Sequence, residues 1–260
     1  MLQILSVFLF EDGFEGIEDK GIEMHSFIKD GAENDLLSPH VKEFLHLNKI
    51  EAQSEIADDS NWNAIWESSF DPILVDNRCI VRANHHTKDD NIEYDIVINP
   101  KMTFGTGHHP TTFLMIKKML DLDFKEKVVF DFGTGTGILA ILAEMMGAKT
   151  IFTNDIDGNC IKNTKENFDL NGVSKAEFKI GDIDLIENRS FDIVLANVTR
   201  NTILERWQKL EKAVKQNGKL IISGFYGADL SFFEEACKAG NLKIIDKEER
   251  DNWLVIVLKK

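Results

Sequence analysis

From residue 128 onward, the hydrophobic and polar positions alternate between two periods. Short apolar runs of strand length are each followed by a segment in which apolar residues recur every three or four positions, as on one face of a helix. The predicted strands cover residues 128–132, 150–153, 177–180, 191–196, 219–224, 242–247 and 253–258. A helix is predicted over residues 203–214, with its end at Asn217-Gly218. The alternation predicts an α/β fold, with helices on both faces of a largely parallel sheet whose last two strands pair antiparallel.

Residues 1–58 follow a different pattern, which predicts a small α+β domain. The predicted elements are a helix at 5–10, strands near 13–18 and 22–28, a turn at Asp30-Gly31, a helix beginning at Ser38-Pro39 and a strand at 51–56. A domain of this size buries little apolar surface by itself.

A polar joint separates this domain from the rest of the chain. Residues 59–69 are predicted to form a helical linker. Trp62 and Trp66 share one face of this helix, where we expect them to pack between the two domains. The α/β domain is expected over residues 70–260, and it begins with a β-hairpin whose turn is Asp76-Asn77.

The segment at residues 128–143 is the centre of the α/β domain. It predicts a strand, a turn with Gly133, Gly135 and Gly137 at alternate positions, and a helix. Glycines allow a sharp turn and close approach to a ligand, and the helix directs free N–H groups and its positive dipole end towards that ligand. Asp131 adds a carboxylate, which would repel phosphate and hold a cationic amino-acid group. The pattern favours a nucleoside ligand that carries an amine.

Polar residues also end the next three predicted strands. Because ligands of parallel sheets bind at the carboxyl ends of the strands, we expect Asp155, Asp182 and Asn197 to lie at one site. Asp155 would bind ribose hydroxyls, Asp182 would accept from the adenine amine, and Asn197 would face the reacting centre. With the glycine turn, these residues predict a site for S-adenosylmethionine, although Asp182 also fits an ordinary turn acid.

A dinucleotide site is the alternative for the same turn. The run from Gly135 to Ala140 also satisfies the dinucleotide fingerprint, and Asp155 lies about twenty residues further on, where a ribose-binding acid is expected. Asp131 would oppose a pyrophosphate at this place. A nicotinamide oxidoreductase therefore stays open as a second hypothesis.

The stretch from Asn99 to Thr112 carries a second signal. Its Phe104-Gly-Thr-Gly107 run indicates close approach of the backbone to a ligand. Pro110 suits the first turn of the helix that follows, where threonine hydroxyls and free N–H groups can bind a carboxylate. His109 fits either this site or an ordinary loop.

No metal site is expected. His85 and His86 have no Cys, Asp or His partner at ligand spacing, so we expect them to be solvated.

Composition narrows the class of protein. Hydrophobic residues make up 43% of the chain, which is enough for a core, and no apolar run reaches the length of a membrane span. The apolar first ten residues are expected to be a core helix and not a signal peptide. Three separated cysteines fit a reducing cytoplasm, and a net charge of −14 disfavours direct nucleic-acid binding and suits a basic partner.

The combined motifs resemble those of the PrmA family, bacterial methyltransferases of ribosomal protein L11. The resemblance covers nearly the whole chain and is carried by these runs: Phe104-Gly-Thr-Gly-His-His-Pro-Thr-Thr112, Asp131-Phe-Gly-Thr-Gly-Thr-Gly-Ile-Leu-Ala140, Asn154-Asp-Ile-Asp157 and Ala196-Asn197. It implies a Rossmann-like, seven-stranded methyltransferase domain, preceded by an α+β domain that recognises the ribosomal protein and a mobile helical linker. By position, it implies cofactor contacts at Thr112, Gly133, Asp155 and Asn197.

Some positions depart from the family pattern. His108 stands where the family usually has Thr, and Thr134 and Thr136 fill the variable places of the glycine loop, but the glycines are kept. The N-terminal domain of the family opens with a strand, whereas this chain starts at the first helix, so we expect that strand to be absent.

The predicted reaction is methylation of lysine side-chain or N-terminal amines of ribosomal protein L11 in the cytoplasm by a monomer. The segment after Asn197 is Val-Thr-Arg-Asn201 and not Asn-Pro-Pro-aromatic, which favours an aliphatic amine. Asn197 would position the amine, Phe104 would shield the methyl path, and no general base is identified. The alternatives are a methyltransferase acting on another protein, RNA or a small molecule, and a cofactor-binding assembly module without turnover.

Overall fold

A computed structural model describes residues 5, 9, 16–19, 24–27, 37–52, 70–99, 107–186 and 188–260 of the chain. The chain divides into two compact units, Met1–Asp58 and Asp59–Lys260. Within the described residues, no helix is both long and apolar enough to cross a membrane.

The first unit contains an antiparallel pair of strands, β1 (Gly16–Asp19) and β2 (Met24–Phe27), and helix α2 (Pro39–Asn48). The predicted start of α2 is confirmed, because Ser38 Oγ accepts a hydrogen bond from the Val41 N–H at 3.3 Å and Pro39 is the first helical residue. Leu5 and Leu9 are helical and form a small core with Val41.

Several expectations lie largely or wholly outside the described residues. They are the strand missing at the N-terminus, the turn at Asp30-Gly31, the strand at 51–56, the linker with Trp62 and Trp66, and the loop that carries Phe104. Of the expected strand at 51–56, the structure describes only Glu51 and Ala52, and neither is in a strand.

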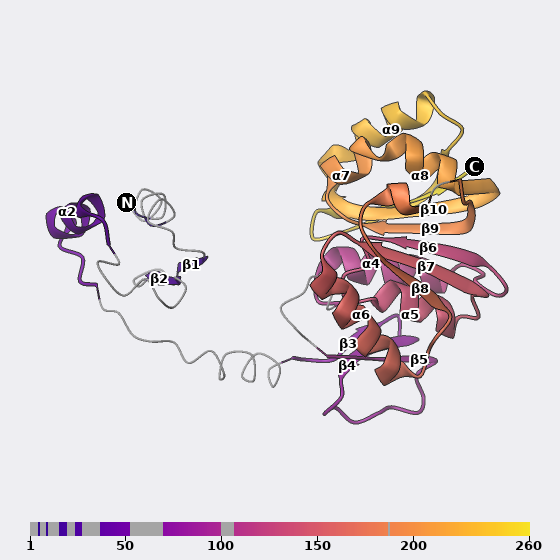
Figure 1. Cartoon of the computed structure of the whole chain (residues 1–260), viewed down its shortest axis with the longest axis horizontal. Coiled ribbons are helices and arrows are strands. Elements are labelled where there is room, and N and C mark those ends of the chain that lie inside the picture. The colour runs from indigo at the N-terminus through magenta and orange to yellow at the C-terminus, as the bar shows by residue number, and fades with distance from the viewer. Residues whose placement is uncertain are drawn as a thin grey trace. The chain divides into compact units, whose positions relative to one another are not determined.

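The second unit is built on a seven-stranded sheet (Figure 1). Its strands are β6 (Val128–Phe132), β7 (Thr150–Asp155), β8 (Ala176–Ile180), β9 (Phe191–Asn197), β10 (Val214–Tyr226), β11 (Lys243–Arg250) and β12 (Trp253–Lys259). In space they are ordered β11-β12-β10-β9-β6-β7-β8. β12 is antiparallel to both of its neighbours, and the pairs from β10 to β8 are parallel. The predicted α/β fold is confirmed.

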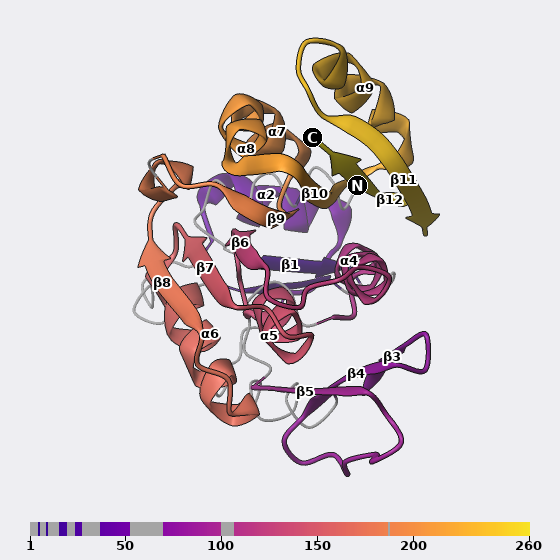
Figure 2. The same ribbon diagram turned by 90° about the vertical axis from the view of Figure 1, so that its right-hand side faces the viewer.

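Helices cover both faces of this sheet, as Figures 1 and 2 show. On one face lie α4 (Pro110–Leu120), α5 (Ile138–Met145) and α6 (Gly158–Asn171), and on the other α7 (Arg200–Glu205), α8 (Trp207–Ala213) and α9 (Leu230–Lys238). The period of two along β9 explains this layering, because Ile193 and Leu195 join one core while Val194 and Ala196 join the other. Short 3₁₀ turns, η1 (Ile183–Ile186) and η2 (Gly227–Asp229), follow β8 and β10.

A small sheet lies on the α5 and α6 side (Figure 2). The predicted hairpin is confirmed as β3 (Ile73–Val75) and β4 (Cys79–Ala83), joined by Asp76 and Asn77 with φ angles of 49° and 54°. β5 (Tyr94–Ile98) pairs parallel with β4 and is joined to α6 by Asn171, whose side chain bonds both Val97 N–H and Val97 C=O.

One predicted helix was wrong in length. The segment expected to be helical over residues 203–214 is broken at Arg206 and ends at Ala213. Val214 instead begins β10, where it pairs with Phe191 and is buried. The reason is tertiary, because pairing and burial of a β-branched residue outweigh its helical spacing.

Candidate functional site

The site predicted from the sequence lies where the strand order reverses. β6 is followed in sequence by β7 and β8 on one side and by β9 and β10 on the other, and ligands of such sheets bind beyond the carboxyl ends of the strands at this reversal. Register places Phe132 beside both Asn154 and Ala196, which brings the ends of β6, β7 and β9 together.

The glycine turn after β6 is held in one conformation. Gly133 has a φ of +71°, and a Cβ there would lie 2.4 Å from Val198 Cγ1, so no other residue fits without movement. The N–H groups of Gly133 and Thr134 both donate to Asn154 C=O at 3.0 Å. Thr164 of α6 donates through its hydroxyl to Gly135 C=O at 2.8 Å. The turn is therefore preformed at the N-terminus of α5.

Asp131 is a buried acid at the end of β6. Its side chain is almost fully enclosed, and Oδ2 accepts a hydrogen bond from the Thr134 hydroxyl at 2.6 Å. Burial raises the pKa of Asp131 to about 7, opposed in part by the Thr134 bond and increased further by the charge of Asp155. A cation bound nearby would restore the ionised form.

Asp155 links the end of β7 to the glycine turn. Its Oδ2 accepts from the Gly135 N–H at 3.0 Å, and its Oδ1 accepts from the Asp157 N–H at 3.0 Å. The next residue, Ile156, is 78% exposed although it is a large apolar side chain. An exposed isoleucine between two acids gives this edge an apolar surface suited to a flat ring.

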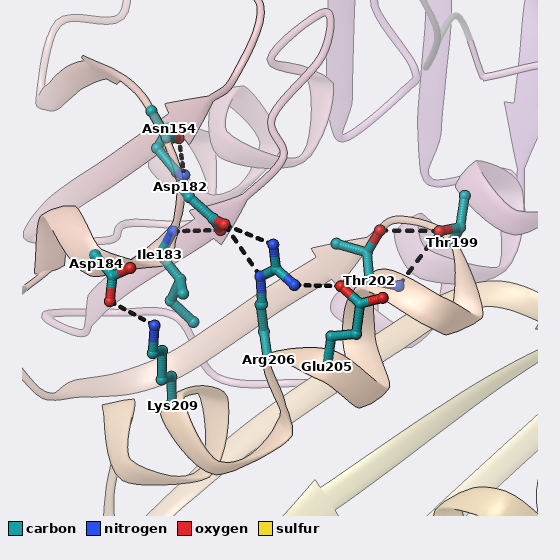
Figure 3. Close-up of polar contacts among 10 residues, drawn as sticks. Asn154, Asp182, Ile183, Asp184, Thr199, Thr202, Glu205, Arg206 and Lys209 are labelled. Atoms are coloured by element: carbon teal, nitrogen blue, oxygen red, sulfur yellow. Dashed lines mark hydrogen bonds and ion pairs between the residues drawn. The ribbon is translucent and has the colours of Figure 1, made fainter.

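Asp182 follows β8 and is paired with Arg206 (Figure 3). Arg206 donates to Asp182 Oδ2 through Nε at 3.0 Å and Nη2 at 2.8 Å, while the Ile183 N–H donates to Oδ1 at 2.7 Å. The Arg206 guanidinium lowers the pKa of the Asp182 carboxyl, although partial burial opposes this effect. Asp182 is therefore more strongly engaged than an ordinary turn acid.

The side chains of Thr112 and Asn197 are joined by a hydrogen bond. Asn197 Nδ2 donates to Thr112 Oγ1 at 3.1 Å, which joins the first turn of α4 to the end of β9. Asn197 Oδ1 is buried and has no hydrogen-bond partner among the described residues. A buried acceptor left unpaired costs about 1–3 kcal/mol, so this atom is suited to a donor on a bound ligand.

His109 sets the start of α4. Its Nδ1 accepts from the Thr111 N–H at 3.4 Å and lies 2.8 Å from the Thr111 hydroxyl, so it acts as the N-cap. The ring also packs edge-on against Trp253, with centroids 4.6 Å apart. Burial lowers the pKa of His109, which keeps the neutral, accepting form. His109 thus orders the turn that presents Thr112.

Two other expectations concern the pair His85 and His86, and Phe104. His86 accepts the Ala83 N–H through Nδ1 at 3.1 Å, and its ring lies beside that of His85. Among the residues that the structure describes, no group of three His, Cys, Asp or Glu side chains could hold a metal ion. Phe104 lies outside the described residues, so its predicted role stays a prediction.

The chain matches the family model for ribosomal protein L11 methyltransferase (PrmA) over residues 7–260. It is 38% identical to the ribosomal protein L11 methyltransferase of Porphyromonas gingivalis, across 97% of this chain and 89% of that relative. A relative of the same description from Bacteroides thetaiotaomicron is 35% identical, across 97% of this chain and 92% of its own length. The chain belongs to the PrmA family.

A solved structure agrees with this assignment. The ribosomal protein L11 methylase from Lactobacillus delbrueckii subsp. bulgaricus superimposes with a TM-score of 0.68 at 25% identity, covering 73% of this chain and 98% of that one. The resemblance to the PrmA family drawn from the sequence is thereby confirmed. A methyltransferase family also decides against the nicotinamide oxidoreductase hypothesis.

Sequence reasoning missed two residues beside the candidate site. Ile156 had a readable signal, since a large apolar residue stands between Asp155 and Asp157 just after a strand. Arg206 had no readable signal in the sequence, because its contact with Asp182 depends on the break between α7 and α8, which the sequence did not predict.

Proposed function

We propose that this protein transfers methyl groups from S-adenosylmethionine to aliphatic amines of ribosomal protein L11. The observation that supports this most directly is the buried, unpaired Asn197 Oδ1 beside Thr112 and the glycine turn. The relatives' descriptions name the same substrate. The net charge of −14 suits a basic partner such as a ribosomal protein.

The residues at the strand ends fit the cofactor. Asp131 would receive the ammonium, because a buried acid with a raised pKa is stabilised by a nearby cation. Thr112 and the N-terminus of α5, with its positive dipole end, suit the carboxylate. Asp155 and Gly133 suit the ribose and the atoms next to it. Asp182 and the exposed Ile156 suit the base. When bound, S-adenosylmethionine supplies an intrinsically reactive methyl group.

The chain's own part in the reaction is to position and desolvate the amine. Asn197 Oδ1 accepts a hydrogen bond from the neutral amine and so orients its lone pair. A lysine has an ordinary pKa near 10.4, so an apolar, partly closed site favours loss of its proton to water. No described residue is assigned as a general base. Phe104 stays the predicted shield of the methyl path.

The proposal also covers the location of the reaction, the amines that are methylated and the role of each part of the chain. We place the reaction in the cytoplasm on lysine side chains, N-terminal amines or both, because the Val198-Thr-Arg-Asn201 segment differs from the Asn-Pro-Pro-aromatic loop. Residues 1–58 are proposed to recognise the ribosomal protein, residues 59–69 to link, and residues 70–260 to catalyse. A different protein, RNA or small-molecule substrate is the alternative.

The test is a methyl-transfer assay with labelled S-adenosylmethionine, the purified chain and ribosomal protein L11. Mass spectrometry would count methyl groups on each amine. Asn197→Ala should lower kcat about tenfold, since one positioning hydrogen bond is worth about 1–1.5 kcal/mol. Asn91→Ala, at an exposed position in the loop between β4 and β5, is the control and should leave kcat unchanged. Cofactor binding with no methylation of this substrate would refute the proposed substrate, and absence of any turnover would favour a binding module.

Cofactor affinity should rise with pH through neutrality. Because the pKa of Asp131 is about 7 without a ligand, its carboxyl is largely neutral at pH 6 and ionised at pH 8. Only the ionised form attracts the ammonium, so the association constant should increase roughly tenfold between pH 6 and pH 8. Calorimetry across this range measures the change. Asp131→Asn should abolish the pH dependence, and an equal slope in that variant would contradict the role of Asp131.

A further inference from the structure

We propose that Arg206 is a positioning residue for cofactor recognition: it holds the Asp182 carboxylate in the one orientation that receives the exocyclic amine of the base. The inference rests on the proposed function, because it presumes that S-adenosylmethionine occupies this edge of the sheet. It goes further by assigning a role in selection of the base to Arg206, which lies between α7 and α8. These helices cover the face of the sheet opposite to α5 and α6.

The two carboxylate oxygens of Asp182 accept hydrogen bonds from different donors in the cluster that Figure 3 shows. Both Arg206 donors reach Oδ2, at 3.0 and 2.8 Å, and the only donor to Oδ1 among the described residues is the Ile183 N–H at 2.7 Å. A carboxylate oxygen accepts about two hydrogen bonds, so Oδ2 is saturated while Oδ1 keeps acceptor capacity. The pairing therefore selects which oxygen is available to a ligand.

Arg206 is itself held in place by the chain. It stands at the break between α7 and α8, with φ −102° and ψ 6°, and its Nη1 is paired with Glu205. With its fork engaged on both sides, the guanidinium cannot rotate freely. A lysine would offer one ammonium in place of this planar fork, so it would keep the charge and lose the orientation.

The side chains that form this pair are only partly exposed. Side-chain exposure is 29% for Arg206 and 33% for Asp182, against 53% for Lys209 and 74% for Asp184 in the second ion pair of the cluster. Lys209 belongs to α8 and Asp184 to η1, so the second pair joins, at 2.6 Å, the two segments that directly follow Arg206 and Asp182, and Lys209 makes no hydrogen bond to Asp182 among the described residues. Lys209→Gln is therefore a matched control that removes the same charge from the same junction.

The experiment compares two ligands in three proteins. S-adenosylhomocysteine carries the exocyclic amine of adenine, and S-inosylhomocysteine carries an oxygen in its place. Calorimetry on the full chain should show that the unaltered protein prefers the amine ligand about tenfold, the value of one charge-assisted hydrogen bond. Arg206→Gln should lose most of this preference by weakening the amine ligand alone. Lys209→Gln should keep it.

The outcomes separate the inference from the proposed function. If Arg206→Gln weakens both ligands equally, or keeps the full preference, Arg206 has no positioning role, while binding by the unaltered protein still supports the proposed function. If the unaltered protein binds neither ligand, the proposed function itself fails. Arg206→Lys should retain the fold and show an intermediate preference, and in an Asp182→Asn background Arg206→Gln should cause no further loss.

Discussion

Replacement of Asp155 by Ala is expected to weaken S-adenosylmethionine binding about 100-fold or more. The substitution removes a carboxylate at the proposed ribose site and the acceptor of the Gly135 N–H, so it also releases the glycine turn. Each charge-assisted hydrogen bond contributes about 1.5–3 kcal/mol, and 100-fold corresponds to about 2.7 kcal/mol. Calorimetric titration measures the affinity, and methyl transfer to ribosomal protein L11 should fall with it.

The control for this prediction is Asp184→Ala. Asp184 is an acid near the same edge whose side chain is 74% exposed and paired only with Lys209 among the described residues, so its removal should leave cofactor affinity within about twofold. Both variants should keep their circular dichroism spectra. If a folded Asp155→Ala protein kept its affinity for S-adenosylmethionine, the cofactor could not be bound at this edge of the sheet.

Replacement of Gly224 by Ala should produce the largest loss of stability. Gly224 has a φ of +104° and lies at the bulge of β10 between Ser223 and Phe225. A Cβ there would lie 2.0 Å from Val198 C=O, which belongs to the segment just after Asn197. Backbone strain of about 1–3 kcal/mol and overpacking of similar size predict a loss of about 4 kcal/mol in the free energy of unfolding.

Gly172→Ala separates strain from packing. Gly172 ends α6 with a φ of +63°, and a Cβ there meets nothing within 4 Å, so only the left-handed backbone penalty of about 1 kcal/mol applies. Urea unfolding of both variants gives the comparison. Equal destabilisation would show that the contact between Gly224 and Val198 does not constrain the β10 bulge.

Much of the fold could be predicted because its signals are local. The central strands β6, β7 and β9 are short, largely apolar runs that end at a polar residue or just before a glycine. The positions of Asp131, Asp155, Asp182 and Asn197 at strand ends followed from the same runs. Where a local signal competed with a distant partner, prediction failed, as at Val214, which follows the helical spacing but pairs with Phe191.

The sequence by itself determined the order of elements, the glycine turn and the residue types at the candidate site, since these depend on hydrogen bonds and periodicity within a few residues. Only the tertiary structure decided which side chains meet. Thr112 and Asn197 lie 85 positions apart, and Asp182 and Arg206 lie 24 apart. Their pairing depends on how α4, the sheet and the α7–α8 break pack, because the strength of a polar contact varies with distance and burial, which a linear pattern does not contain.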